Sequence, residues 1–411
     1  MNDHYDTLET RSPDERQAAI TDGIRAHIAH AKTQSPYYRE TLAAIDSATF
    51  HSLSDLQQLP LTRKRDLPNR QRSRPPFGGM VTVTPPELTH IFASPGPIYE
   101  PGAARADFWR FARALYAAGF RTGDLLHNTF SYHLTPAGHM VESGAHTLGC
   151  AVIPAGVGQT ELQAQTIATL QPNGYTGTPS FLKILLEKGD QLNLDLSSVG
   201  KALVSGEALP PTLRALFQAR GLHTRQCYAT ADVGVIAYES DAMDGLILNE
   251  GLHLEIVRPG SNQPVPDGEV GEVVVTPLTP EYPLVRFATG DLSTIIPGAS
   301  PCGRTNRRIK GWLGRADQAA KVRGLFIHPE QLHQLHTRHA EVGKLRLVIE
   351  WREHADQLTL HCECAHPDPN LHTAIATGFR DLCTLRADIR ILPPGSLAND
   401  GKVIADERQY D

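Results

Sequence analysis

The sequence has little of the features that mark disulfide-rich, membrane-spanning or nucleic-acid-binding proteins. Its six cysteines are scattered over 411 residues, which excludes a disulfide framework and a two-pair zinc motif. No apolar run approaches the roughly 20 residues that span a bilayer, and the acidic N-terminal stretch lacks a signal-peptide core. Lys and Arg number 39 against 45 Asp and Glu, so the net charge of −6 offers no basic surface for nucleic acid or membrane. We therefore expect a cytoplasmic globular protein that binds neither.

The order of helical and extended patterns predicts an α/β fold. From residue 106 to about residue 278, helical windows alternate with short apolar strands. This alternation predicts a parallel sheet with helices on both faces. The predicted helices are 108–118, 160–170 and 180–186, and the predicted strands are 150–154, 174–177 and 202–206.

The C-terminal part of the chain predicts a second, smaller domain. After residue 252 the pattern becomes β-rich, with strands expected at 252–257, 271–276 and 283–288. Further on, helices are expected at 329–339 and 371–383, and strands at 344–351, 358–364 and 388–392. We place the boundary near Asp317, which separates an N-terminal domain, 1–314, from a small α+β domain, 318–411.

Two cysteines, Cys362 and Cys364, lie between His361 and His366 and could be taken for a metal site. The segment 358–364, however, alternates apolar and polar residues as a strand does, which places both thiols on one face. We favour a half-buried strand here and keep metal binding as the lesser alternative.

Two segments that are rich in small residues follow predicted strands, and their backbone could approach a flat ligand. Residues 205–208 read Ser-Gly-Glu-Ala, and small side chains there would let the backbone come close to a planar group. Residues 228–234 supply an aromatic ring, small residues and the carboxylate of Asp232 within one turn. Taken singly, each segment is better explained by an ordinary packed turn.

Two further segments combine glycine with a charged side chain. Asp291, with Thr289 and Gly290, is expected to close the strand 283–288, where a carboxylate can accept both hydroxyls of a ribose. Arg315 lies at the expected domain junction, and a guanidinium can clamp a phosphate through two oxygens. The alternative for the second segment is a hinge with solvated charges.

Together and in this order, the segments resemble the adenylate-forming superfamily of acyl-CoA synthetases, peptide-synthetase adenylation domains and luciferases. The closer resemblance is to its phenylacetate–CoA ligase branch, and it extends over nearly the whole chain. The matching motifs are SPYY at 35–38, LPLT at 59–62, GA at 144–145, LG at 148–149, IP at 153–154, TPS at 178–180, DGEVGE at 267–272, RFATGD at 286–291, CGRT at 302–305 and GRAD at 314–317.

The resemblance implies a large N-terminal domain with mixed and parallel sheets layered by helices, and a small mobile α+β C-terminal domain. It implies that a carboxylic acid reacts with ATP to give acyl-adenylate and pyrophosphate, and that CoA then displaces AMP. The implied cofactors are ATP/AMP, Mg²⁺ and coenzyme A, and the implied partners are small molecules, with a homodimer left open. A carrier-protein thiol or an amine remains an alternative acceptor, and a non-catalytic sensor of nucleotide or acyl-CoA is the third hypothesis.

The resemblance also assigns roles to individual residues. Lys402 and Arg315 match catalytic positions: the lysine enters the site during adenylation, and the arginine contacts the nucleotide. Asp291 matches the ribose-binding carboxylate, Asp317 the hinge, and Asp232 a glutamate that helps to hold Mg²⁺. The positions that match the adenine slot and its neighbours are Ser205, Gly206, Glu207, Ala208, Tyr228, Ala229, Thr230 and Ala231.

The acid-binding pocket is expected within residues 130–139, with Tyr132 and Gly138 as candidate lining residues. Aromatic and small residues at this place in the branch make an aryl or arylacetic acid our first choice of substrate. Ordinary packing at a strand-to-helix connection is an equal alternative for Tyr132.

The chain departs from the branch in two places. Where the family's phosphate loop reads SSGTTGKP, this chain has Ser94 to Pro101, with Glu100 in place of the lysine. We expect Glu100 to point away from the triphosphate and to pair with a neighbouring arginine. Relatives also carry a zinc-like ligand set, which is matched here by Ser240, His253, Ser300 and Cys302. Two candidate ligands are too few for a closed four-ligand site, so we expect no zinc.

Overall fold

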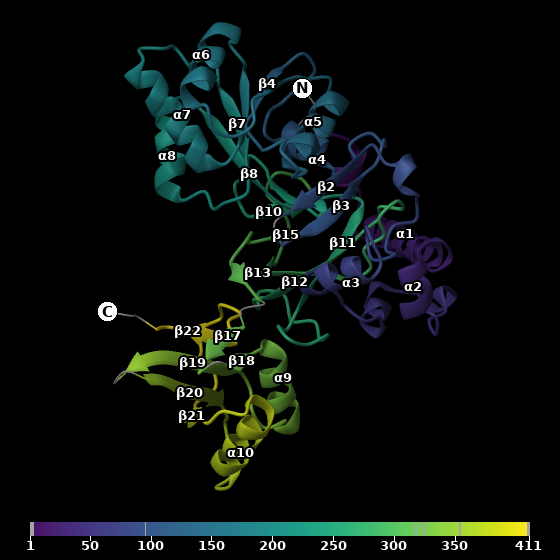
Figure 1. The fold of residues 1–411 in the computed structure, drawn as a ribbon, viewed down its shortest axis with the longest axis vertical. Helices are drawn as coiled ribbons and strands as arrows, with labels where there is room; N and C mark the ends of the chain where they lie inside the picture. Colours follow the sequence, from purple (N-terminus) through teal and green to yellow (C-terminus); the bar gives the residue numbers. More distant parts are fainter. Residues whose placement is uncertain (1–3, 95, 317–318, 324, 353–354, 409–411) are drawn as a thin grey trace. The chain divides into compact units, whose positions relative to one another are not determined.

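The computed structural model describes residues 4–94, 96–316, 319–323, 325–352 and 355–408 (Figure 1). The expected hinge residue Asp317 lies outside these ranges. The chain forms two compact units. Unit 1 comprises residues 1–254, 275–287 and 296–311, and unit 2 comprises residues 255–274, 288–295 and 312–411. No helix in the described ranges combines the length and the apolar character needed to cross a membrane.

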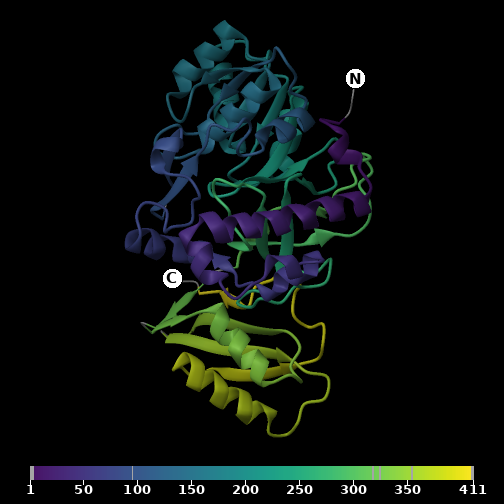
Figure 2. The ribbon, with the colours of Figure 1, turned by 90° about the vertical axis from the view of Figure 1, so that its right-hand side faces the viewer.

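Unit 1 begins with a long helix, α1 (Pro13–Gln34), which is followed by α2 (Pro36–Thr41) and α3 (Leu67–Ser73) (Figure 2). The start of α1 is fixed by a capping box, because Ser12 caps the backbone of Glu15 while the Glu15 carboxylate accepts from the backbone of Ser12. Short 3₁₀ helices cover Thr7–Thr10, Ser47–Thr49, Leu53–Gln58, Lys64–Asp66 and Pro85–Glu87.

The nine-stranded sheet has the strand order β14-β15-β10-β9-β8-β7-β6-β4-β5. Strands β4 to β8 run parallel, whereas β9 and β10 pair antiparallel. The strands are β4 (Leu125–Asn128), β5 (Ala151–Pro154), β6 (Gly174–Gly177), β7 (Lys201–Val204), β8 (His223–Thr230), β9 (Gly234–Glu239), β10 (Leu246–Leu248), β14 (Ile295–Ile296) and β15 (Arg308–Ile309).

Helices cover both faces of this sheet (Figure 1). On one side lie α4 (Phe111–Ala117) and α5 (Ala137–Leu148), and on the other α6 (Thr160–Leu170), α7 (Pro179–Gln191) and α8 (Pro211–Ala219). Strand β7 shows why, since Leu203 is buried with α4 and α5 while Ala202 and Val204 are buried with α6 to α8. The prediction of a helix-covered parallel sheet is therefore confirmed.

A second sheet has the order β1-β13-β12-β11, and β16 also pairs with β13. Its strands are β1 (Thr62–Arg63), β11 (Leu252–Val257), β12 (Gly271–Pro277), β13 (Phe287–Ser293) and β16 (Gly314–Arg315). A separate hairpin joins β2 (His90–Ser94) to β3 (Ile98–Gly102).

The strand expected at 283–288 is wrong, because β13 begins only at Phe287. Arg286 adopts a left-handed φ of 47°, which no regular strand accommodates, and its fully buried guanidinium donates to the Leu59 carbonyl at 2.7 Å. The apolar run before it is buried as a turn. Asp291 consequently lies in the middle of β13 rather than at its end.

The C-terminal part of unit 2 is an α+β layer in which α9 (Pro329–Arg338) and α10 (Leu371–Cys383) cover a four-stranded sheet of order β21-β20-β19-β22 (Figure 2). The strands are β19 (Leu345–Arg352), β20 (Ala355–Glu363), β21 (Asp388–Leu392) and β22 (Ile404–Asp406), and a separate hairpin is formed by β17 (Ala320–Val322) and β18 (Leu325–Ile327). Cys362 and Cys364 are buried in this hydrophobic core, and burial raises the pKa of the Cys362 thiol to about 12. The strand interpretation of this segment is confirmed.

Candidate active site

The two small-residue segments of unit 1 lie side by side at the carboxyl ends of neighbouring parallel strands. Ser205 follows β7, and its hydroxyl donates to the Cys227 carbonyl in β8 at 2.8 Å. Gly206 adopts a left-handed φ of 84°, which turns the chain out of the strand. The carboxylate of Glu207 accepts from the Ser180 backbone N–H at 3.1 Å. Such a strand-end crevice is a common ligand position in α/β sheets.

The segment 228–231 continues β8 into the turn before β9. Tyr228 is buried, and a bulge between Tyr228 and Ala229 shifts the register with β9. Thr230 caps the turn by accepting from the Val233 backbone N–H at 3.2 Å, and Ala231 follows it. The structure thus brings the two expected adenine-slot segments together in unit 1.

Asp232 is held by a lysine that sequence reasoning missed. The Lys64 ammonium lies 2.5 Å from Asp232 Oδ2, and the Asp232 side chain is 0% exposed. Within the described ranges, Oδ1 of Asp232 has no hydrogen-bond partner. Lys64 stands 168 positions away, directly after Thr62 and Arg63. Its position just after the LPLT motif at 59–62 was the only sequence signal that could have indicated its role.

The altered phosphate-loop segment forms the β2–β3 hairpin, and its residue Pro95 lies outside the described ranges. Glu100 is 1% exposed and accepts a hydrogen bond from Ser94 on the facing strand. Its other neighbours of opposite or like charge are Lys64 and Asp232. The expected arginine partner is therefore wrong. Instead, the hairpin places the Ser94 hydroxyl beside Glu100, and the fold of the chain brings Lys64 near the same carboxyl group.

Burial, followed by the nearby Asp232 carboxylate, raises the pKa of Glu100 to about 8, against the opposing effects of Ser94 and Lys64. The folded state then binds a proton that the unfolded chain releases near its ordinary pKa. The contribution of Glu100 to stability therefore falls as the pH rises from about 5 to about 8. We expect Glu100→Gln to remove roughly 3 kcal/mol of this fall.

The measurement is chemical unfolding of wild type and Glu100→Gln at pH 5.5 and pH 8. The exposed Glu187→Gln variant on α7 is the matched control and should follow the wild type. Parallel pH profiles for wild type and Glu100→Gln would contradict the protonation of this buried carboxyl group.

The expected acid-binding segment is organised by Asn128 at the end of β4, a residue that sequence reasoning missed. Its amide Nδ2 donates to the Tyr132 hydroxyl at 2.8 Å and to the Gly138 carbonyl at 2.9 Å. A Cβ on Gly138 would lie 2.9 Å from the Tyr132 ring, so only glycine fits. The structure thus brings both candidate residues together.

A series of ring contacts extends from Tyr132 through His139 to His90 and Phe92. The ring of His139 lies 5.0 Å from Tyr132, 4.6 Å from His90 and 5.4 Å from Phe92, as measured between centroids. Burial, followed by the adjacent Glu142, raises the pKa of Tyr132, so its hydroxyl stays neutral. Flat rings of this kind are suited to contact with another aromatic group.

In unit 2, Asp291 and Arg315 face each other across the β13–β16 pair. The Arg315 guanidinium lies 3.0 Å from Asp291 Oδ1, and the indole Nε1–H of Trp312 donates to the same oxygen at 3.1 Å. Asp291 is buried, whereas Trp312 is 54% exposed. Sequence reasoning named the carboxylate and the arginine but missed the tryptophan.

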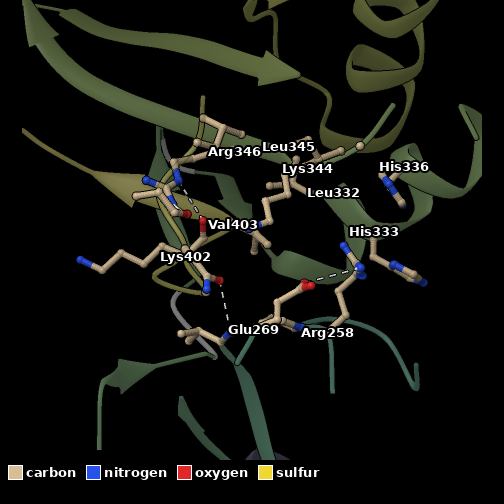
Figure 3. Close-up of a pocket in the computed structure, with 17 residues that line it drawn as sticks. Arg258, Glu269, Leu332, His333, His336, Lys344, Leu345, Arg346, Lys402 and Val403 are labelled. Carbon is tan, nitrogen blue, oxygen red and sulfur yellow. Dashed lines mark hydrogen bonds and ion pairs between the residues drawn. The ribbon is translucent and has the colours of Figure 1, made fainter. Parts of the chain in front are cut away.

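Lys402 follows Gly401 just before β22. Its backbone carbonyl accepts from Arg346 Nε at 3.0 Å, and its backbone N–H donates to Asp400 at 3.1 Å. The side chain is exposed and extends away from Arg258 and Glu269 (Figure 3). Backbone hydrogen bonds thus hold Lys402 in place, while its ammonium group is exposed.

Three of the four positions that match the relatives' zinc-like set lie together. The Cys302 thiol is 3.1 Å from the Ser300 hydroxyl, and Ser240 is a further hydrogen-bonding neighbour. His253 is half-buried near Arg307 and Arg286, and burial, with these charges, lowers its pKa to about 4. No group of three or more metal-ligating side chains occurs in the described part of the chain.

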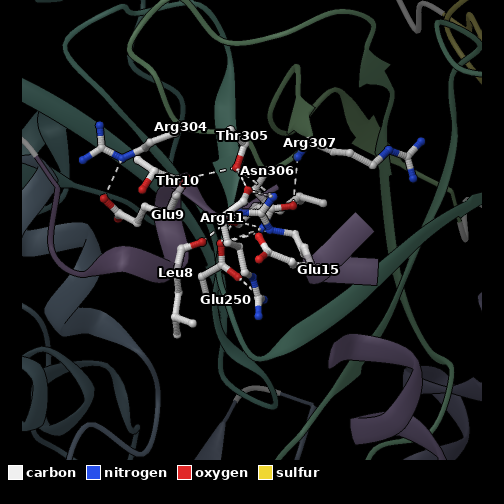
Figure 4. Close-up of polar contacts among 12 residues, drawn as sticks. Leu8, Glu9, Thr10, Arg11, Glu15, Glu250, Arg304, Thr305, Asn306 and Arg307 are labelled. Carbon is white, nitrogen blue, oxygen red and sulfur yellow. Dashed lines mark hydrogen bonds and ion pairs between the residues drawn. The ribbon is translucent and has the colours of Figure 1, made fainter. Parts of the chain in front are cut away.

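An ion-pair network anchors the N-terminal segment beside this cluster (Figure 4). The buried Glu9 pairs with Arg304 at 3.1 Å and accepts from the Tyr238 hydroxyl at 2.7 Å, and Arg16 pairs with Glu250 at 3.1 Å. Arg304 also approaches Cys302 Sγ at 3.6 Å. The Arg304 guanidinium therefore lies beside the Cys302 thiol, and its positive charge would repel a Zn²⁺ ion bound there.

We expect the purified protein to contain no stoichiometric zinc, since serine at two of the four positions and an arginine beside Cys302 disfavour the ion. Elemental analysis of the protein after dialysis without chelator measures this directly. One zinc per chain would contradict the expectation, and the Cys302→Ala variant would then show whether this cluster or Cys362 and Cys364 hold the metal.

Comparison with known proteins gives three findings. Residues 113–277 match the family model of AMP-binding enzymes. The chain is 33% identical to phenylacetate-coenzyme A ligase of Escherichia coli (strain K12) over 381 residues, covering 88% of this chain and 85% of that protein. It is 31% identical to phenylacetate-coenzyme A ligase of Aromatoleum evansii over 382 residues, covering 89% and 85%.

The solved structures similar to this chain include 2-hydroxyisobutyryl-CoA ligase in an open conformation, in complex with 2-HIB-AMP and CoA. That structure superposes with a TM-score of 0.72 at 25% identity, covering 95% of this chain and 91% of the other. The thioesterification state of the same ligase superposes with a TM-score of 0.71 and covers 98% and 92%.

Proposed function

Because this chain belongs to the phenylacetate-coenzyme A ligase family of AMP-binding enzymes, we propose that it is an AMP-forming carboxylate–CoA ligase for an aryl or arylacetic acid. The acid reacts with ATP to give acyl-adenylate and pyrophosphate, and CoA then gives the thioester and AMP. The main support for this activity is the sequence identity to phenylacetate-coenzyme A ligases over most of the chain. The ring group around Tyr132 supports an aromatic acid. A cytoplasmic location fits these substrates.

The nucleotide roles follow from the chemistry of the side chains. The segments at 205–208 and 228–231 offer backbone and a tyrosine ring to a planar base. The Asp291 carboxylate would accept the ribose hydroxyls, with Arg315 and Trp312 holding it in place. Lys402 would stabilise the charge that develops between the carboxylate and the α-phosphate, because a flexible ammonium can meet oxygens of both. Asp317 is proposed as the hinge between domains 1–314 and 318–411.

The residues present fit Mg²⁺. Mg²⁺ is commonly held by one or two carboxylates together with substrate phosphates, and Asp232 keeps a buried oxygen, Oδ1, without a partner in the described ranges. When bound, the ion would neutralise charge on the leaving pyrophosphate. Lys64 would keep the Asp232 carboxylate oriented.

The choice between acceptors favours free CoA. The superposed 2-hydroxyisobutyryl-CoA ligase was solved with CoA, and the similarity covers nearly all of both chains. The sensor hypothesis rested on a repulsive Glu100, and that carboxyl group is buried against Ser94 rather than displayed on the hairpin surface.

A panel of carboxylic acids tests the proposal. Arylacetic and aryl acids should release pyrophosphate and, only with free CoA, yield a thioester, whereas short aliphatic acids should react much less. The same panel with a carrier protein or amines in place of CoA identifies the other acceptors. Thioester formation from carrier protein alone would overturn the choice of CoA.

A further inference from the structure

Three buried oxygen atoms of unit 1 have no hydrogen-bond partner among the described residues. They are Glu100 Oε2, Asp232 Oδ1 and the hydroxyl oxygen of Tyr282. All three residues belong to unit 1, and none of them is more than 6% exposed. Because buried polar atoms are nearly always paired in folded proteins, three unpaired oxygens in one neighbourhood indicate a missing partner.

The electrostatic effects of these side chains on one another place them together. After burial, the Asp232 carboxylate is the next largest cause of the raised pKa of Glu100. Both carboxylates, again after burial, raise the pKa of the Tyr282 hydroxyl. Lys64 pairs with Asp232 Oδ2 at 2.5 Å and also acts on Glu100. Two carboxyl groups and a phenol therefore gather around one lysine.

The cluster has one carboxyl group more than it has cations. In the part of the chain that the structure describes, Lys64 pairs with Asp232, whereas Glu100 has only the neutral Ser94 hydroxyl as its hydrogen-bond donor. Buried carboxylates are stable when they are paired or when they coordinate a metal ion. Oxygen donors of this kind suit Mg²⁺ and Mn²⁺ rather than softer ions.

We propose that Glu100 and Asp232 together bind one divalent cation, Mg²⁺ or Mn²⁺, through Glu100 Oε2 and Asp232 Oδ1, in the absence of nucleotide. The inference rests on the proposed function, in which Asp232 alone is assigned to Mg²⁺. Ser94 and Lys64 occupy the other oxygen of each carboxylate and leave these two oxygens for the ion. The Tyr282 hydroxyl is the nearby group that can donate to a water molecule on it.

This site explains how a carboxyl group can replace the lysine of the family's phosphate loop. A divalent ion on the Glu100 carboxylate leaves one net positive charge at this position, which equals the charge of the lysine. Bound cations are often the largest local charges in a phosphate site, so the hairpin with its ion attracts a triphosphate rather than repelling it. The second carboxylate also lets the protein hold the ion without the substrate phosphates on which Mg²⁺ commonly depends.

Binding of Mn²⁺ to nucleotide-free, chelator-treated protein tests the proposal without catalysis, and electron paramagnetic resonance measures the free ion. At about pH 8 we expect the wild type to bind one ion per chain. Glu100→Gln and Asp232→Asn should each weaken binding at least about tenfold, because each removes a charged ligand. Glu187→Gln, at an exposed carboxylate on α7, is the matched control and should bind as the wild type does.

The Glu100→Asp variant distinguishes direct contact from an effect of charge alone. It keeps the carboxylate but withdraws it by one methylene, so a direct ligand predicts weakened binding here too. Binding as tight as that of the wild type in Glu100→Gln or in Glu100→Asp would overturn the proposal. If Glu100→Gln does not fold, Glu100→Asp and Asp232→Asn still decide.

The fate of the proposed function can be separated from that of this site. Absence of Mn²⁺ binding by the nucleotide-free wild type would overturn the site, and acid-dependent release of pyrophosphate by the same preparation would leave the proposed function standing. Conversely, Glu100-dependent Mn²⁺ binding by a protein that activates no acid would support the site and count against the proposed function alone.

Discussion

Lys402→Ala should lower the rate of acyl-adenylate formation at least about a hundredfold while leaving the conversion of supplied acyl-adenylate to thioester nearly intact. The attack on the α-phosphate builds negative charge on oxygens that an ammonium group can meet, and losing that contact corresponds to roughly 3 kcal/mol of transition-state stabilisation. Lys402 is suited to this role because its backbone is fixed by Arg346 and Asp400 while its side chain is exposed.

Two assays separate the half-reactions. Pyrophosphate exchange measures adenylation, and chemically prepared acyl-adenylate with CoA measures thioester formation. Lys183→Ala, at a partly exposed lysine on α7, serves as the control and should behave as wild type in both. An equal loss in the two assays would remove Lys402 from a specific role in adenylation.

Asp291→Ala should weaken the binding of ATP and AMP alike, by about 30-fold. A buried carboxylate that accepts two ribose hydroxyls leaves both unpaired when it is removed, and the loss of such a charged acceptor costs about 2 kcal/mol. The substitution also removes the acceptor Asp291 Oδ1, which Arg315 and Trp312 share.

Calorimetry with AMP measures this effect without catalysis. Trp312→Phe removes the indole donor but keeps the carboxylate and the ring, so it should reduce affinity much less. If AMP binds Asp291→Ala as tightly as the wild type, Asp291 does not contact the ribose.

Much of the fold could be predicted because local patterns and tertiary structure agree. The predicted helices 160–170 and 371–383 and the strands 174–177 and 388–392 coincide with α6, α10, β6 and β21. In α10, for example, the apolar spacing matches the helix face that packs into the core. The prediction of a strand at 283–288 is wrong because a buried apolar run can form either a strand or a buried turn. The left-handed backbone of Arg286 is not visible in the pattern of apolar residues.

Site residues that lie within short sequence motifs could be predicted. Site residues that only the tertiary fold brings together were missed. Ser205 and Asp232 stood out within short motifs. Lys64 approaches Asp232 only because the chain returns after 168 residues, and the neighbours of Glu100 follow from hairpin register and from that same return. No local sequence pattern predicts such tertiary contacts.

The central claim, that the acid is activated by transfer to the α-phosphate of ATP, is tested most directly by following oxygen. An arylacetic acid labelled with ¹⁸O in both carboxylate oxygens is converted with ATP and CoA, and the nucleotide product is analysed by mass spectrometry. In the proposed reaction a carboxylate oxygen bonds to the α-phosphorus as pyrophosphate leaves, and the thiol then breaks the bond between that oxygen and the carbonyl carbon. The account predicts AMP that carries one ¹⁸O and pyrophosphate that carries none. Label in inorganic phosphate with ADP as the nucleotide product, or thioester formed with unlabelled AMP, would contradict it.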